Sequence, residues 1–298
     1  MRTRVLLVAA GVELTLGAGG ADALPANHGA HPRVVADNDR GMWVWDEADP
    51  VEVVAFALSH RVGRLFLAIP GEVTSSPSVL ARAQKTIVAA HAVGIEVDAL
   101  GGDPGWVDNE GWVLENWLTP ALSVGFDGIH VDIEPYANPS RVTDRAGTTT
   151  RYLHLLAALA AMSAEGGRRP VEADVPFWFN TIVDGAGGQL DTAVLARVSS
   201  VAIMAYRNTA TGPDGTLVLA GPTLNAARSV GKKARIGQET RYLGPSPGEV
   251  RQTFFGQTNT QLETQLGVID SVERTNPAYL GIAVHDHTGW AAISPGPT

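Results

Sequence analysis

Three ionisable side chains alternate along residues 126–136, and their types suit acid–base chemistry. His130, Asp132 and Glu134 are separated by valine and isoleucine, so a β-strand here would carry the ionisable groups on one face and apolar groups on the other. Unpaired charge is costly to bury. The pattern therefore indicates either an ion-paired edge strand or an acid–base site at a strand end, and we favour the site.

Carboxylate, aromatic and histidine side chains recur near the ends of the other predicted strands. Aromatic rings stack on the apolar faces of sugars, while carboxyl groups supply protons or a nucleophile, so the mixture is typical of a carbohydrate site. A purely structural role is the competing interpretation for several of them. The further candidates are Trp45, Asp98, Trp178, Met204, Tyr206, Arg207, Glu239 and His285.

Residues 285–287 contain two metal-ligand types. Neighbouring residues of a strand point to opposite sides, so only His285 and His287 could converge on one ion, and the sequence spacing indicates no third ligand. We therefore expect no metal and no other cofactor. The chain has no cysteine, which excludes disulfide bonds, thiolate metal sites and cysteine nucleophiles.

Eight strand-like stretches alternate with helical patterns, which predicts a single-domain (β/α)8 barrel over residues 41–298. In this fold the C-terminal ends of the strands form the active site. Few residues follow the eighth strand, so the last helix should be short or replaced, and a doubly wound open sheet is the alternative fold. The predicted strands are 41–45, 64–69, 95–100, 126–134, 171–179, 200–206, 234–240 and 279–284. The predicted helices are 50–60, 76–93, one from the 101–105 loop to about 124, then 148–164, 190–198, 222–230 and 260–274.

The N-terminus predicts export. Arg2 and Arg4 precede an apolar stretch, and residues 21–23 supply a small-x-small cleavage pattern, although Glu13 interrupts the stretch. We therefore expect a signal peptide over 1–23, a linker or arm over 24–40, and a secreted or cell-envelope protein with no integral membrane segment. The net charge of −9 and the lack of a basic patch argue against nucleic-acid binding.

The fourth predicted strand resembles a known signature. The run Asp-Gly-Ile-His-Val-Asp-Ile-Glu at 127–134 is similar to the Asp-Gly-x-Asp-x-Asp-x-Glu motif of glycoside hydrolase family 18, the chitinase-like barrels, with His130 replacing the first inward aspartate. The Met-Ala-Tyr run at 204–206 resembles the family's strand-six Met-x-Tyr, and Arg207 stands where an aspartate usually follows. His285 lies near the place of a tryptophan that floors the sugar subsite.

The resemblance implies roles for particular residues. Glu134 would be the general acid, Asp132 would orient the substrate's own 2-acetamido group as the nucleophile, and Tyr206 would hydrogen-bond that group. The residues also allow a second mechanism, in which Glu134 is the acid/base and Glu239 the nucleophile. That mechanism needs the two carboxyl groups about 5–5.5 Å apart.

The sequence therefore predicts a secreted glycoside hydrolase that retains anomeric configuration and acts on a polysaccharide or oligosaccharide. A chitinase-like barrel that binds carbohydrate without turnover is the alternative, because His130 departs from the signature. A structural protein is the third possibility.

Overall fold

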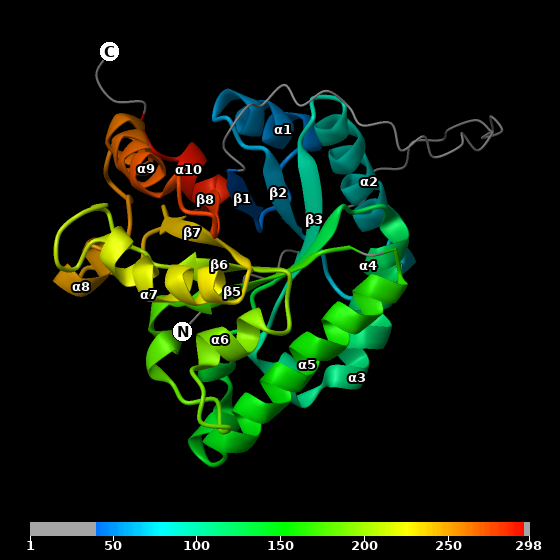
Figure 1. The fold of residues 1–298 in the computed structure, drawn as a ribbon. Helices are drawn as coiled ribbons and strands as arrows, with labels where there is room; N and C mark the ends of the chain where they lie inside the picture. The colour runs from blue at the N-terminus through cyan, green and yellow to red at the C-terminus, as the bar shows by residue number, and fades with distance from the viewer. Residues whose placement is uncertain (1–39, 168, 295–298) are drawn as a thin grey trace, which may run out of the picture. The chain divides into compact units, whose positions relative to one another are not determined.

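A computed structural model describes residues 40–167 and 169–294, which form a closed barrel of parallel strands (Figure 1). The strands follow chain order around the ring, and β8 pairs with β1 to close it. The (β/α)8 prediction is confirmed. The strands are β1 (Gly41–Val44), β2 (Arg64–Ala68), β3 (Glu96–Gly101), β4 (Gly128–Val131), β5 (Val171–Pro176), β6 (Ser200–Met204), β7 (Lys233–Glu239) and β8 (Tyr279–His285).

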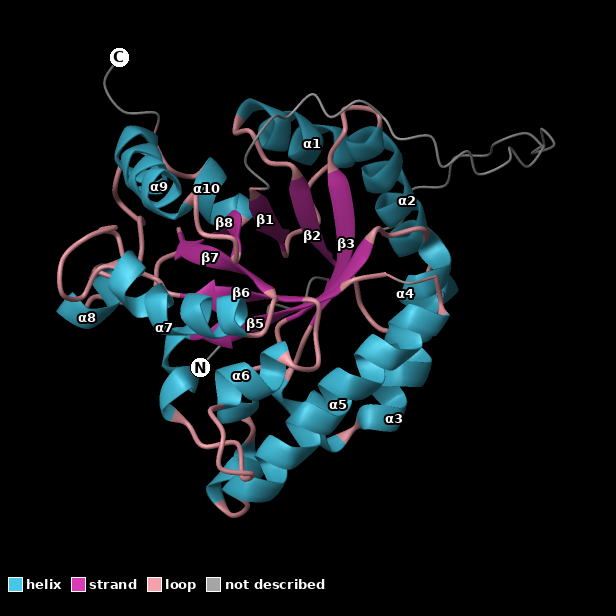
Figure 2. Cartoon of the chain, viewed as in Figure 1, coloured by secondary structure: helices cyan, strands magenta, loops and turns pink. Residues whose placement is uncertain are grey.

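The helices lie outside the ring of strands (Figure 2). The α-helices are α1 (Pro50–Ser59), α2 (Pro77–His91), α3 (Glu110–Trp112), α4 (Thr119–Val124), α5 (Arg145–Glu165), α6 (Leu190–Leu195), α7 (Thr216–Ser229), α8 (Pro247–Val250), α9 (Asn259–Glu273) and α10 (His287–Ala291). Shorter turns are η1 (Val73–Ser75), η2 (Pro104–Asp108), the π-helical η3 (Val113–Leu118), η4 (Pro135–Ala137), η5 (Pro139–Val142) and η6 (Phe177–Thr181). None of these described helices is long and apolar enough to span a membrane.

Local sequence signals explain where several helices begin. The Asp49 carboxylate accepts a hydrogen bond from the Val51 N–H at 2.8 Å, and proline occupies the first helical position of α1. Both α8 and α9 start with a capping box. The Ser246 or Thr258 hydroxyl accepts a hydrogen bond from the backbone N–H three residues later, and the side chain of that later residue accepts one from the Ser246 or Thr258 backbone N–H. These caps supply partners for N–H groups that the first turn leaves unpaired.

Several element boundaries differ from the predictions, those of α5, α7 and β4 among them. Helix α5 begins before residue 148, because Asp144 caps it through the Gly147 N–H. Helix α7 starts before Pro222, which lies inside the helix although proline favours the first turn. Strand β4 ends at Val131, earlier than predicted, and the chain beyond it turns toward η4. The last helix, α10, is short, as expected.

The inside of the barrel holds a buried apolar cluster in contact with buried charged side chains. Trp43, Phe66, Leu100, Ala202 and Ala283 form a separate buried cluster. Outward-facing strand residues belong to a larger core with the helices. The predicted signal peptide, and the predicted linker apart from Arg40, lie outside the described residues.

Candidate active site

We call the C-terminal ends of the strands, with the loops that follow them, the rim. Beyond β4 the Asp132 N–H still donates to the Gly101 carbonyl at 2.9 Å, so the chain keeps its strand path for one more residue. Glu134 then adopts a left-handed conformation (φ 52°, ψ 59°) before Pro135 begins η4. A non-glycine residue in this region costs about 1 kcal/mol, and such strain is concentrated at functional sites.

The Glu134 side chain is partly buried and held by a neighbour. The Tyr136 hydroxyl donates a hydrogen bond to Glu134 Oε1. The Tyr136 ring meets Trp178 edge-to-face, with 5.1 Å between ring centroids. The structure thus places an aromatic pair beside the predicted acid. Tyr136 is not among the predicted site residues, although its position two residues after Glu134 is a usable signal.

Asp132 lies where the loop after β3 approaches closely. A Cβ atom on Gly102 would lie 1.9 Å from the Asp132 carbonyl oxygen, so only glycine permits this approach. The Asp132 side chain is partly buried at the rim. Its charge acts on both Tyr206 and His285, which places it in the same electrostatic environment as these two residues.

Tyr206 follows β6 and is positioned to donate a hydrogen bond. Burial, together with the charges of Glu239, Asp174 and Asp132, raises the pKa of Tyr206 well above its usual value. The phenol therefore keeps its proton at any working pH. Its hydroxyl makes no hydrogen bond to any residue in the described part of the chain. The ring lies 6.3 Å from that of His285, measured between centroids.

Glu239, at the end of β7, is only 3% exposed and fully engaged. Its Oε1 accepts the backbone N–H groups of Thr240 at 2.8 Å and Arg241 at 2.7 Å. Its Oε2 lies 2.9 Å from Nδ1 of His285. A nucleophile needs an accessible lone pair directed at the substrate, and in this arrangement both oxygens of Glu239 are directed at the protein.

His285 connects Glu239 to Trp45. Burial disfavours the imidazolium, but the Glu239 carboxylate outweighs it and raises the pKa of His285. The Trp45 indole N–H, however, is directed at His285 Nε2 at 3.0 Å, and that nitrogen accepts only when it carries no proton. The indole contact therefore specifies the neutral ring in this conformation, with its proton on Nδ1 and donated to Glu239.

Comparisons with known proteins also identify the fold as a (β/α)8 barrel of the chitinase type. No protein-family model and no curated protein matches the sequence. A GH18 chitinase variant from Cycas revoluta, in complex with (GlcNAc)4, superposes with a TM-score of 0.55 at 10% identity, covering 82% of this chain and 94% of that one. The fold is that of the family 18 chitinases.

Two bacterial structures resemble this chitinase-like barrel to a similar degree. The chitinase from Chromobacterium violaceum has a TM-score of 0.51 at 12% identity, covering 86% of this chain and 98% of its own. The spore cortex-lytic enzyme SleL of Bacillus megaterium has a TM-score of 0.52 at 13% identity, covering 83% of this chain and 70% of its own. At these identities the comparisons establish the fold alone.

Two predicted site residues, His130 and Asp98, lie inside the barrel and not at the rim with Glu134, and a third, Arg207, lies in the loop after β6 with its side chain buried. His130 is fully buried inside the barrel. Asp98 is 3% exposed and ion-paired with Arg64 at 2.6 Å. Arg207 is buried against the protein: its Nη2 donates to Asp214 at 2.9 Å and its guanidinium lies over the ring of Phe177. Met204, at the end of β6, is partly buried.

His130 belongs to a network of buried charges beneath the rim. Its Nε2 lies 2.9 Å from Asp174 Oδ1, and its Nδ1 lies 3.4 Å from Glu172 Oε1. Glu172 is also bonded by Arg235 at 3.1 Å, and Asp174 accepts the Trp43 indole N–H at 3.0 Å. Burial opposes the imidazolium, but the two carboxylates prevail and raise the pKa of His130 to about 10. A buried cation thus stands where the chitinase-like signature has an inward aspartate.

The two histidines after β8 bind different carboxylates. His285 contacts Glu239, whereas His287 Nδ1 lies 2.8 Å from Asp46. Hydrogen bonds from His287 and Thr288 outweigh the effect of burial and lower the pKa of Asp46. Within residues 40–167 and 169–294, no group of three or more histidine, aspartate and glutamate side chains is arranged to hold a metal ion.

Proposed function

We propose that this protein is a glycoside hydrolase that cleaves chains of 2-acetamido sugars with retention of configuration. Glu134 is the general acid/base, and the substrate's acetamido group is the nucleophile. The observation that carries the proposal is the set of hydrogen bonds made by the Glu239 carboxylate. Its two oxygens are occupied by two backbone N–H groups and His285, which disfavours Glu239 as a nucleophile. Asp132, Glu134 and Tyr206 remain at the rim for substrate-assisted chemistry.

In the first half-reaction Glu134 protonates the leaving glycosidic oxygen. Tyr206 donates its hydroxyl to the acetamido group, and the Asp132 carboxylate accepts the acetamido N–H, so the carbonyl oxygen is directed at the anomeric carbon. That oxygen forms the new bond as the glycosidic bond breaks, giving a cyclic oxazolinium. Glu134, now a carboxylate, takes a proton from water, which opens the ring and restores the original configuration.

The structural neighbours support the same class of substrate. The Cycas revoluta chitinase is described with (GlcNAc)4 bound, and the Chromobacterium violaceum neighbour is a chitinase. Export through the signal peptide predicted over 1–23 is part of the proposal, because polysaccharides of this kind lie outside the cell membrane.

Removal of the acetamido group from the substrate should abolish turnover. We expect aryl β-glycosides of N-acetyl-chitobiose to be hydrolysed with kcat/KM about 10³-fold or more above the matched cellobioside, because the 2-hydroxy sugar lacks the internal nucleophile. Release of the aryl group, followed by fluorescence, measures both. Comparable values for the two glycosides would exclude the substrate-assisted mechanism.

Glu239→Ala should not be rescued by azide. A missing carboxylate nucleophile is replaced by azide, which yields a glycosyl azide, whereas loss of a residue that positions His285 leaves no such vacancy. We expect reduced activity in Glu239→Ala and no azide adduct by mass spectrometry. Glu239→Gln, which keeps an acceptor for the backbone N–H groups, serves as the control for folding. A glycosyl azide product would reinstate Glu239 as the nucleophile.

One observation favours a second candidate, carbohydrate binding without turnover. The Tyr136 hydroxyl donates to Glu134 Oε1, so one oxygen of the carboxyl group is already bonded to the protein instead of to a glycosidic oxygen. Under this alternative, calorimetry would detect binding of N-acetyl-chitooligosaccharides, and no shorter products would form over a long incubation.

A further inference from the structure

A small pocket lies next to the aromatic pair that flanks Glu134. Its walls come from η4, η5, the first turn of α5 and η6, and they include Tyr136, Arg141, Thr148 and Trp178. Tyr136 belongs to both places, because its ring lines the pocket while its hydroxyl bonds Glu134. The enclosed space holds about one water molecule, which is the size of one carboxylate oxygen. A substituent on a sugar that sits against Trp178 would therefore reach it.

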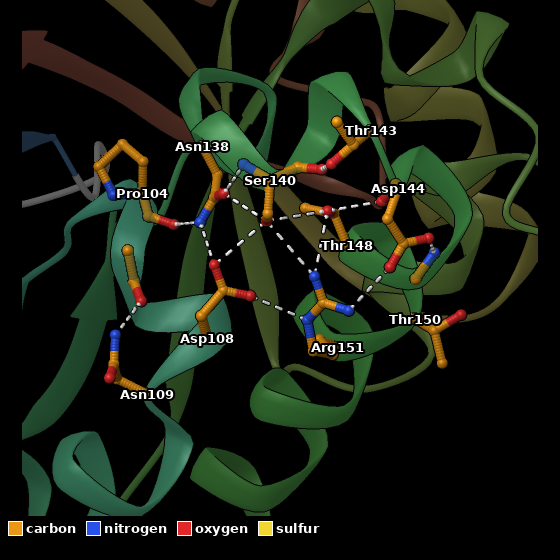
Figure 3. Close-up of polar contacts among 12 residues, drawn as sticks. Pro104, Asp108, Asn109, Asn138, Ser140, Thr143, Asp144, Thr148, Thr150 and Arg151 are labelled. Atoms are coloured by element: carbon orange, nitrogen blue, oxygen red, sulfur yellow. Dashed lines mark hydrogen bonds and ion pairs between the residues drawn. The ribbon is translucent and has the colours of Figure 1, made fainter.

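Arg141 gives this pocket an uncompensated positive charge. Its guanidinium makes no hydrogen bond or ion pair with any residue of the described chain, although the side chain is partly buried. The two nearby carboxylates are held by another arginine. Arg151 Nε binds Asp108 at 2.9 Å, and Arg151 Nη1 binds Asp144 at 3.1 Å (Figure 3).

A hydrogen-bond network fixes the segment that carries Arg141. The Asn138 amide donates to the Pro104 carbonyl at 2.6 Å and to Asp108 Oδ2 at 3.0 Å. Ser140 Oγ donates to the same carboxylate oxygen at 3.1 Å and lies 3.3 Å from Thr148 Oγ1 (Figure 3). The loops after β3 and β4 and the start of α5 are thereby joined by hydrogen bonds around the segment that carries Arg141.

We propose that this pocket binds a carboxylate substituent of the sugar chain, with Arg141 as its partner. The inference rests on the proposed function and narrows its substrate class to acidic chains of 2-acetamido sugars. A guanidinium recognises a carboxylate through two parallel hydrogen bonds. The protein as a whole carries a net charge of −9, so long-range attraction does not favour an anion, and the selectivity must come from this short-range contact.

The test uses two matched substrates. One is an oligosaccharide of 2-acetamido sugars that carry carboxyl groups as lactyl ethers, and the other is the same chain with those groups converted to methyl amides. For the wild-type protein we expect kcat/KM to be about 10- to 100-fold higher for the acid than for the amide. A hydrogen-bonded ion pair between Arg141 and the substrate carboxylate would stabilise binding by an amount that corresponds to this ratio. In Arg141→Gln the ratio should fall to near one. Arg145→Gln, an exposed arginine four residues away, should keep the wild-type ratio.

Two outcomes would overturn the inference: a ratio near one in the wild-type protein, or a wild-type ratio in Arg141→Gln. Calorimetric binding of both chains to Glu134→Gln separates this inference from the proposed function. If neither chain is hydrolysed but the acid binds more tightly, and Arg141→Gln removes the difference, the catalytic proposal fails and the carboxylate site stands. If both are hydrolysed equally, the site fails and the catalytic proposal stands.

Discussion

Glu134→Gln is expected to lower kcat for glycoside hydrolysis by about 10³-fold or more, with the fold and the sugar affinity retained. A positioned acid or base contributes roughly 10²–10⁴-fold, and Glu134 acts in both steps of the proposed reaction. The glutamine amide has nearly the same shape, and its oxygen can still accept the Tyr136 hydroxyl, but it cannot release a proton to the leaving group.

The measurement is the initial rate with aryl N-acetyl-chitooligosaccharides, alongside calorimetric binding of the unlabelled oligosaccharide. Glu47→Gln is a matched control, because Glu47 is an exposed glutamate in the loop after β1. A Glu134→Gln variant with full activity would remove Glu134 from the mechanism. A variant that neither turns over nor binds sugar would point instead to a disturbed rim.

His130→Asp restores the residue of the family signature, and it is expected to destabilise the barrel by about 3–5 kcal/mol. The side chain is fully buried between Asp174 and Glu172, with its ring stacked on Phe66 at 3.8 Å between centroids. Aspartate would place a third carboxylate where a cation now pairs two. Arg235 would still bind Glu172, but Asp174 would lose its cationic partner.

The pairing of His130 with Asp174 and Glu172 also predicts that the stability of the protein depends on pH. The pKa of His130 is about 10 in the folded protein and near 6.5 in an unfolded chain. Because the folded pKa is the higher one, the stabilisation is fully present below about pH 6.5 and is lost as the pH rises through 10. The free energy of unfolding of the wild-type protein should therefore fall across this window, and that part of the fall should be absent in His130→Asp.

Urea unfolding followed by circular dichroism, at pH 6 and pH 10, measures both effects. The same substitution at the exposed His154, which pairs with Glu110 at the surface, should cost under about 1 kcal/mol. The double variant His130→Asp/Asp174→Asn should regain part of the loss, because it removes one of the crowded carboxylates. Wild-type stability in His130→Asp would show that the ion pair contributes nothing to the barrel.

The sequence by itself determined the fold and the position of Glu134 at its rim. Strand and helix periodicities are local properties, and eight alternations of the two leave few arrangements other than a closed barrel. The period of two along 126–134 put Asp132 and Glu134 on the inward face at the end of the fourth strand, and the structure places both at the rim.

Only the tertiary structure decided how deep each inward-facing side chain lies and what it meets there. His130 and Asp98 share the inward face with Asp132, but their positions one or more layers down the barrel bury them among charged partners from other strands. Glu239 is locked by backbone N–H groups of its own loop and by a histidine from β8. Such partners come from residues far apart in the chain, and a period of two carries no information about depth or about neighbouring strands.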